Sequence, residues 1–108
     1  MNESPVLLHV WSVHPDHADA LVDRLAGLFE RVSDVPGFVS ARILASADRD
    51  SVAAVVEMRS AEDRERLEAL PDVHETLYGV SGAYNLMVRL YDQVKAFGVE
   101  ARDARRVG

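Results

Sequence analysis

At 108 residues the chain has room for one domain with one core, and its 48% hydrophobic and 28% charged residues are ordinary for a globular protein. Its formal charge of −6 argues against a nucleic-acid partner, because phosphate is met by a basic surface. Cysteine is absent, which excludes disulfides and thiol nucleophiles and fits a reducing cytoplasm. No apolar run reaches the roughly 20 residues that cross a bilayer, and the start of the chain lacks a basic signal-peptide segment, so we expect no membrane partner.

The first half of the chain predicts a strand, a helix and a second strand. Residues 6–13 are rich in β-branched and apolar side chains, which favours a strand. Residues 16–32 carry apolar side chains at helical spacing, and Pro15 suits the first turn of that helix. Residues 33–37, Ser-Asp-Val-Pro-Gly, end the helix.

The second strand is predicted over residues 38–45. Simple alternation along it places Val39, Ala41 and Ile43 on one face. The same alternation places the remaining members of the strand on the other face, namely Phe38, Ser40, Arg42 and Leu44.

A hairpin and a capped helix follow. The polar residues 47–50 form a turn, so the next strand, 51–59, should pair antiparallel with the strand before it. Ser60 and Asp63 resemble a capping box that opens a helix over 61–70.

Pro71 interrupts this helix, and a short third helix is predicted at about residues 72–80. Residues 84–94 then form the last strand. We therefore expect one folded domain over residues 1–94, followed by a weakly periodic tail, 95–108.

The order β-α-β-β-α-β predicts a ferredoxin-like α+β sandwich, in which the helices cover one face of a four-stranded sheet. The strands are nevertheless apolar on both sides: Val52 and Ala54 alternate with Ala53 and Val55. A second copy is the simplest cover for the other face, so we expect a homodimer that closes into a dimeric α+β barrel. The alternative is a monomer whose C-terminal tail folds over the sheet.

The stretch 10–42, with its run Val-Pro-Gly-Phe-Val-Ser-Ala-Arg, resembles the antibiotic biosynthesis monooxygenase superfamily. The resemblance continues at residues 55–60 and 88–94 and spans about residues 6–94. It implies a dimeric α+β barrel with a pocket between the sheet and the helices. It also implies an oxygenase that needs no cofactor or metal and acts on an aromatic or polyketide-like small molecule.

The sequence departs from the catalytic patterns of that superfamily. Its cofactor-free oxygenases for anthrone-type polyketides carry an Asn and a Trp on the third strand, where this chain has Ala54 and Met58. The haem-degrading branch uses an Asn, a Trp and a His, which fall at His9, Met58 and about Tyr78. None of the three is kept, so the reaction stays open.

His9 and Trp11 are two residues apart in the first strand and therefore share one face. If that face lies under the helices, both side chains point into the pocket. Imidazole titrates near neutral pH, so His9 is a candidate general base for a phenol or a β-diketone carbon. The alternative is a core histidine that is hydrogen-bonded to backbone.

His74 and Tyr78 are four residues apart, on one face of the third helix. A tyrosine hydroxyl could hold a substrate enolate while a histidine takes the proton, so both join His9 as candidate catalytic residues. The alternative is that Val73, Leu77 and Val80 form the buried stripe and His74 is solvated.

Several side chains are candidate substrate contacts. Arg42 and Arg89 could fix a carboxylate or phenolate, or could instead be edge-strand charges or intersubunit ion pairs. Met58 and Met87 would form a soft wall, although such residues are often plain core. The candidate set is Trp11, Phe38, Arg42, Met58, Met87 and Arg89.

His14 and His17 have the i, i+3 spacing of a metal pair. They flank a proline at a helix start, and no third ligand is evident in the sequence, so we expect no metal.

Two reaction classes fit these residues. In the first, the substrate carbanion itself reduces oxygen, while the protein supplies a base and a dry pocket. In the second, the same pocket runs a non-redox cyclisation, isomerisation or dehydration. A haem-binding or non-catalytic dimer is the third alternative.

Overall fold

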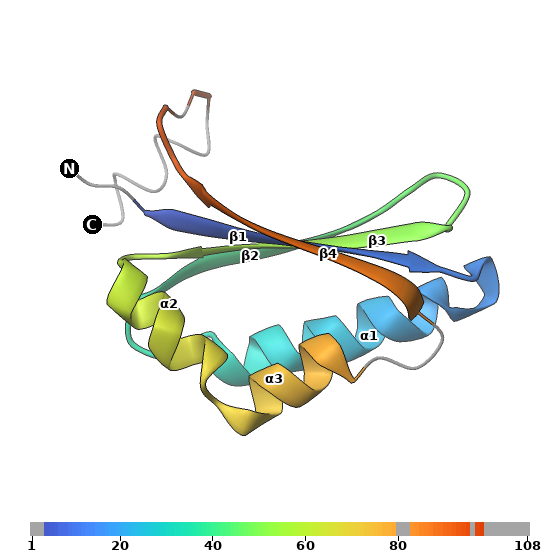
Figure 1. Cartoon of the computed structure of the whole chain (residues 1–108), viewed down its shortest axis with the longest axis horizontal. Helices are drawn as coiled ribbons and strands as arrows, with labels where there is room; N and C mark the ends of the chain where they lie inside the picture. The colour runs from blue at the N-terminus through green and yellow to red at the C-terminus, as the bar shows by residue number, and fades with distance from the viewer. Residues whose placement is uncertain (1–3, 80–82, 96, 99–108) are drawn as a thin grey trace.

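The computed structural model describes residues 4–79, 83–95 and 97–98. Within these residues the elements follow the predicted β-α-β-β-α-β order, with the second helix divided in two (Figure 1). The ferredoxin-like α+β fold is therefore confirmed. The elements are β1 (Pro5–Val13), α1 (Pro15–Val32), β2 (Phe38–Ala45), β3 (Ser51–Met58), α2 (Ala61–Glu68), α3 (Pro71–Tyr78) and β4 (Ala83–Asp92).

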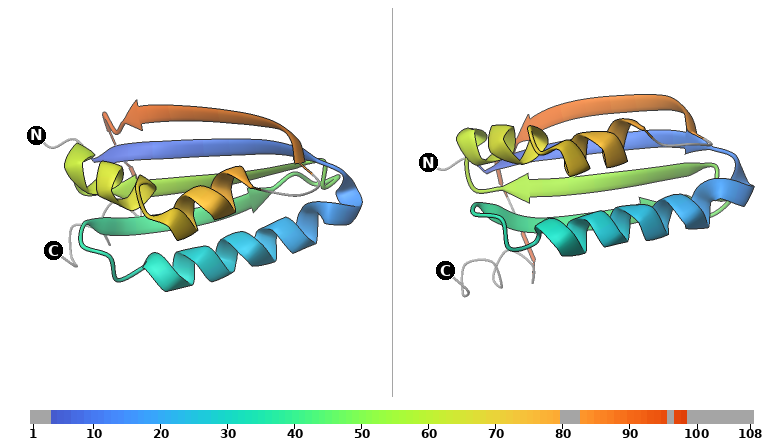
Figure 2. Two further views of the ribbon diagram at one scale, coloured as in Figure 1. Left: turned by 60° about the horizontal axis from the view of Figure 1, so that its bottom comes forward. Right: turned by 90° about the horizontal axis from the view of Figure 1, so that it is seen from below.

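The described strands form one antiparallel sheet in the order β2-β3-β1-β4. Figure 2 shows α1, α2 and α3 on the same face of this sheet. We call the other face the open face. It is defined by Val6, Leu8, Val10 and Ser12 of β1 and by the residues paired with them.

Alternation along the central strands sets which side chains the helices cover. The odd-numbered residues of β1 are buried from Pro5 to Val13, and the even-numbered residues between them are half-buried. In β3 the even-numbered residues are buried, because they stand opposite the odd-numbered residues of β1. The main core cluster consists of Trp11, Val13, Ala18, Leu21, Leu25, Leu28, Val32, Val52, Ala54, Val56, Met58, Leu67, Val73 and Leu77.

Helix α1 is amphipathic, with one buried apolar stripe against the sheet. Pro15 occupies its first turn, as predicted. Near its end the Arg31 guanidinium donates to both carboxylate oxygens of Asp72 on α3, at 2.8 and 3.0 Å. This exposed pair joins the two helices and holds the pKa of the Asp72 carboxyl below its ordinary value.

The loop before β2 is locked to the start of α2. Gly37 has φ +88°, and a Cβ at this position would overlap the buried Asp63 carboxyl. The predicted cap is confirmed: the Ser60 hydroxyl accepts from the Asp63 backbone N–H and donates to the Asp63 carboxylate. Hydrogen bonds from Arg66, and then from Ser60, lower the pKa of Asp63.

Strand β2 corrects one prediction, because a β-bulge lies between Phe38 and Ser40. Phe38 pairs with Met58, while Ala41 pairs with Val56. Phe38 therefore faces the helices together with Ala41 and Ile43, and simple alternation assigned it to the wrong face. The extra residue of the bulge shifts the pleat by one position.

The helix ends also differ from prediction. Helix α2 stops at Glu68, and Pro71 starts α3 instead of lying between the helices, because its fixed φ suits a first turn. Val80 and residues 96 and 99–108 of the predicted tail lie outside the described residues. Among the described helices, none is long and apolar enough to cross a membrane.

Candidate active site

His9 lies at the middle of β1, on the face that the helices cover. It stands between Ala54 of β3 and Val88 of β4 in the sheet register. Its side chain is fully buried, with 0% of the residue exposed. The predicted strand face thus points toward the helices, and His9 is part of the interior.

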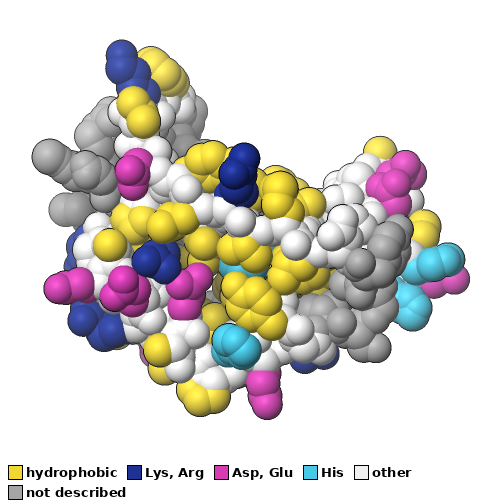
Figure 3. All heavy atoms as spheres, viewed as in Figure 1, with side chains coloured by type: hydrophobic (Ala, Val, Ile, Leu, Met, Phe, Trp, Pro, Cys, Tyr) yellow, Lys and Arg dark blue, Asp and Glu magenta, His cyan; other side chains and the backbone are white. Residues whose placement is uncertain are grey.

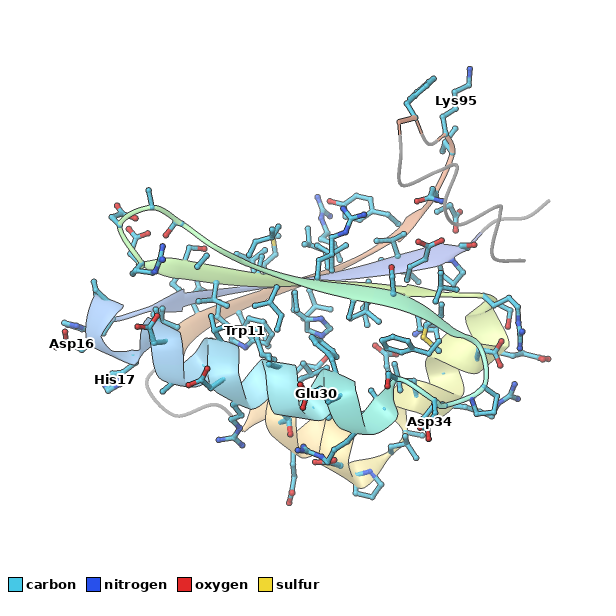
Figure 4. The ribbon with its side chains drawn as sticks, turned by 180° about the vertical axis from the view of Figure 1, so that it is seen from behind. Trp11, Asp16, His17, Glu30, Asp34 and Lys95 are labelled. Atoms are coloured by element: carbon cyan, nitrogen blue, oxygen red, sulfur yellow. The ribbon has the colours of Figure 1, made fainter. Side chains whose placement is uncertain are left out.

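Trp11 stacks on His9 within the same strand. The two ring centroids are 5.6 Å apart, and the ring planes differ by 14°. The Trp11 indole Nε1–H donates to the backbone carbonyl of Leu77 at 3.2 Å. Figure 4, seen from behind, shows Trp11 between the sheet and the helices. Trp11 therefore holds the last turn of α3 against β1.

Tyr78 is the last residue of α3 and covers His9 from the outside. Its hydroxyl oxygen lies 3.5 Å from Nε2 of His9, and the two rings meet edge to face with centroids 5.9 Å apart. Tyr78 is 46% exposed, so it connects the buried imidazole to the surface.

His74 packs against Tyr78, with ring centroids 5.0 Å apart. Val73 and Leu77 are buried, as in the alternative interpretation of this helix, and His74 is exposed. The i, i+4 spacing does bring His74 and Tyr78 into contact. The structure therefore brings together the three candidate catalytic residues in the order His9, Tyr78, His74 from the interior outward.

The surroundings of the pair keep both side chains neutral near pH 7. Burial lowers the pKa of His9 to about 4, and its Nδ1 has no hydrogen-bond partner among the described residues. Partial burial raises the pKa of the Tyr78 hydroxyl, and the Glu68 carboxylate of α2 raises it further. Glu68 accepts a hydrogen bond from Arg64, 2.5 Å away.

An exposed apolar strip borders this pair on β4. Val88 pairs with His9 and Leu90 pairs with Leu7, so both face the helix side, yet they are 39% and 50% exposed. They remain exposed because the helices pack chiefly over the other strands and leave this edge strand less covered (Figure 2). In Figure 3, hydrophobic side chains gather between β4 and α3. An apolar ligand lying on this strip would reach the Tyr78 hydroxyl.

The sequence pattern did not indicate this strip or the role of Glu68. The i, i+4 spacing of Arg64 and Glu68 was the available signal for an ion pair. The uncovered edge of β4 depends on where the helices pack, which no local pattern encodes.

The remaining candidate contacts divide between two places. Met58 is buried, stands opposite Phe38, and lies four residues along β3 from Ala54, the partner of His9. Half-buried Phe38 packs against the same core cluster as Met58.

Arg42, Met87 and Arg89 lie on the open face. They stand opposite Val55, Val10 and Leu8 respectively. Side chains alternate strictly along a strand, so these three point away from the face that carries His9. The structure does not bring them together with the candidate catalytic residues.

His14 and His17 lie at the start of α1, with ring centroids 6.3 Å apart. In the described part of the chain, no group of three or more His, Asp or Glu side chains could hold a metal ion.

No family model matches the sequence, and no curated protein matches it. Solved structures do. A monooxygenase from the ActVA-Orf6 gene of Streptomyces coelicolor, in complex with the ligand nanaomycin D, has 24% identity and a TM-score of 0.75 over 90% of this chain and 93% of that one.

Two proteins provisionally assigned as antibiotic biosynthesis monooxygenases are similar as well. The Deinococcus radiodurans protein has 13% identity and a TM-score of 0.76, covering 88% of this chain and 97% of its own. The Nitrosomonas europaea protein has 17% identity and a TM-score of 0.75, covering 91% and 97%. The chain thus has the fold of the antibiotic biosynthesis monooxygenases, as the resemblance in its sequence implied.

Proposed function

We propose that this protein is a cofactor-independent monooxygenase of the antibiotic biosynthesis type, acting on an aromatic or polyketide-like small molecule in the cytoplasm. One observation carries the proposal. A buried imidazole, His9, lies within reach of the half-exposed Tyr78 hydroxyl, beside the apolar strip formed by Val88 and Leu90. The site thus offers a flat apolar ligand a base and an apolar surface on which to lie.

The chemistry needs a base because the substrate supplies the electrons. Removing a proton from an activated phenol or a carbon next to a carbonyl gives an electron-rich anion. The anion passes electrons to molecular oxygen, a C–O bond forms, and loss of water leaves a carbonyl. The protein has to position the anion and keep the site dry.

A second candidate is a non-redox cyclase or isomerase at the same site. It is favoured by the apolar character of β3, where the anthrone oxygenases of the family carry an Asn and a Trp. Ala54 and Met58 are both buried in the core, so β3 offers no polar side chain beside His9. Proton transfer at this site then relies on His9 and Tyr78. A cyclisation or isomerisation needs the same proton transfer.

The open face supports a homodimer in this proposal. Val6, Leu8, Val10, Ala53 and Val55 form its half-buried centre. Met87 and Tyr91 of β4 are 45% and 47% exposed on the same face. Arg42 and Arg89 lie on this face beside its apolar centre. A second copy that packs on the face would remove the apolar centre from water.

Oxygen consumption by the purified protein, measured with a panel of anthrones, naphthols and quinols, tests the function. Oxygen uptake that is lost on replacing His9 supports the oxygenase. Substrate loss without oxygen uptake supports the cyclase or isomerase. If none of these compounds reacts, both the oxygenase and the cyclase or isomerase are contradicted. A Soret band on haem titration would then indicate a haem-binding protein.

A further inference from the structure

The burial of His9 raises a problem for its role as a base. The residue is 0% exposed, and its Nε2 points at the Tyr78 hydroxyl oxygen 3.5 Å away. A substrate on the outer surface meets Tyr78 first, because Tyr78 is 46% exposed. Proton transfer between substrate and imidazole must therefore pass through the tyrosine hydroxyl.

Two contacts of Trp11 fix the geometry of this path. Its ring stacks nearly parallel on His9 and sets the plane of the imidazole. Its indole N–H binds the carbonyl of Leu77, the residue before Tyr78. Trp11 thus contacts both His9, the proton acceptor, and the turn of α3 that carries Tyr78, the proton donor. We therefore describe it as a positioning residue.

We propose that Tyr78 is the catalytic residue that takes the substrate proton, and that His9 is the internal acceptor for the hydroxyl proton of Tyr78. This inference rests on the proposed site and assigns its roles. The substrate C–H or O–H bond breaks, and that proton bonds to the Tyr78 oxygen. The Tyr78 O–H bond breaks in the same step, and its proton bonds to Nε2 of His9. The products are a substrate anion, neutral Tyr78 and imidazolium, and no electron is transferred.

The charges around the pair favour a coupled transfer over a free tyrosinate. Glu68 of α2, which is paired with Arg64, places a negative charge near Tyr78, and His74 of α3 packs against the Tyr78 ring. Partial burial, and then the nearby Glu68 carboxylate, disfavour a free tyrosinate and raise the pKa of Tyr78. When the two protons move together, Tyr78 stays neutral and the new negative charge is on the substrate. Burial disfavours the imidazolium of His9 and lowers its pKa, and the adjacent negative charge on the substrate offsets part of this cost.

Proton abstraction can be measured without oxygen. The probe is anthrone in D₂O under nitrogen, where exchange of its C10 hydrogens for deuterium reports deprotonation by NMR. The wild-type protein should accelerate exchange. Tyr78→Phe and His9→Gln should each lower that acceleration about 100-fold or more, and the double variant should lose no more than either single variant. Tyr91→Phe is the matched control, because Tyr91 is equally exposed (47%) and lies on the opposite face from His9, where phenylalanine keeps the apolar ring of the open face.

A wild-type exchange rate in Tyr78→Phe would overturn the relay. Loss in Tyr78→Phe alone, with His9→Gln folded by circular dichroism and fully active, would overturn the role of His9. Exchange without oxygen uptake in air would leave the relay standing and contradict only the oxygenase.

A second measurement detects the tautomer of His9 in the wild-type protein and requires neither a substrate nor a variant at His9. The relay requires an unprotonated Nε2 that accepts from Tyr78, so ¹⁵N NMR at pH 7 should show the Nδ1–H tautomer of His9. Tyr78→Phe should shift the Nε2 resonance, and Tyr91→Phe should not. An Nε2–H tautomer in the wild-type protein would overturn the proposal.

Discussion

Trp11 and Leu77 are 66 residues apart in the chain, yet the indole N–H of Trp11 donates to the Leu77 carbonyl at 3.2 Å inside the core. This bond fastens the end of α3 to the centre of the sheet. It decides where Tyr78 lies, because Tyr78 is the next residue along the chain.

Trp11→Phe tests this bond. Phenylalanine keeps an aromatic ring on His9 but leaves the buried Leu77 carbonyl without its donor and a gap where the indole was. We expect a loss of about 2–4 kcal/mol in the free energy of unfolding. Urea denaturation followed by circular dichroism measures it, since Trp11 is the only tryptophan and fluorescence would be lost. A change below about 0.5 kcal/mol would show that the bond contributes nothing.

Gly37→Ala should be among the costly single-methyl additions in this chain. The new Cβ would overlap the Asp63 carboxyl, and φ +88° is strained for alanine. We expect a loss of about 3 kcal/mol or more.

Gly98→Ala is the matched control, because Gly98 also has a positive φ (+93°) but no atom of the described residues lies within 4 Å of the added Cβ. Its cost should be about 1 kcal/mol or less. Equal costs in thermal or urea unfolding would mean that backbone strain alone, and not the contact with Asp63, makes the glycine necessary.

Acid should destabilise the fold through His9. Folded His9 has a pKa of about 4, whereas an unfolded histidine has the ordinary 6.5. Between pH 6.5 and pH 4 the unfolded chain binds more protons at His9 than the folded protein does. The free energy of unfolding is therefore highest above pH 6.5 and falls as the pH drops toward 4. The lowered pKa corresponds to at most about 3 kcal/mol.

His9→Gln removes this component. Urea unfolding at pH 7 and pH 4.5 should show a smaller loss of stability on acidification in His9→Gln than in the wild-type protein. Parallel losses in the two proteins would show that His9 is not held neutral by burial.

Local periodicity predicted the elements and the face shared by His9 and Trp11, because period-2 alternation is enforced by the pleat. It failed at Phe38, where the bulge adds a residue that no local pattern marks. The approach of Tyr78 to His9 spans 69 residues and depends on the packing of α3, so the sequence offered both residues but not their contact.

The same limit explains the three candidates on the open face. The sequence marked Arg42 and Arg89 as charges within strands and Met87 as a soft wall, but only the inter-strand register assigns each one a face. The register of β4 is set by its pairing with β1, and the register of β2 by its pairing with β3. The packing of the helices decides which faces of β1 and β3 are buried. The outcome is a site smaller than the candidate set, built from β1 and α3.

The homodimer proposal makes a prediction at the centre of the open face. Leu8 of β1 lies there half-buried, with Arg89 and Val55 as its neighbours in the sheet. A lysine at this position would place a charge in the apolar contact between two sheets, so Leu8→Lys should be monomeric at concentrations where the wild-type protein is dimeric. Ala20→Lys on the exposed side of α1 is the control and should stay dimeric. Analytical ultracentrifugation decides the matter: a monomeric wild-type protein, or a Leu8→Lys variant that remains dimeric, would remove the open face as the subunit interface.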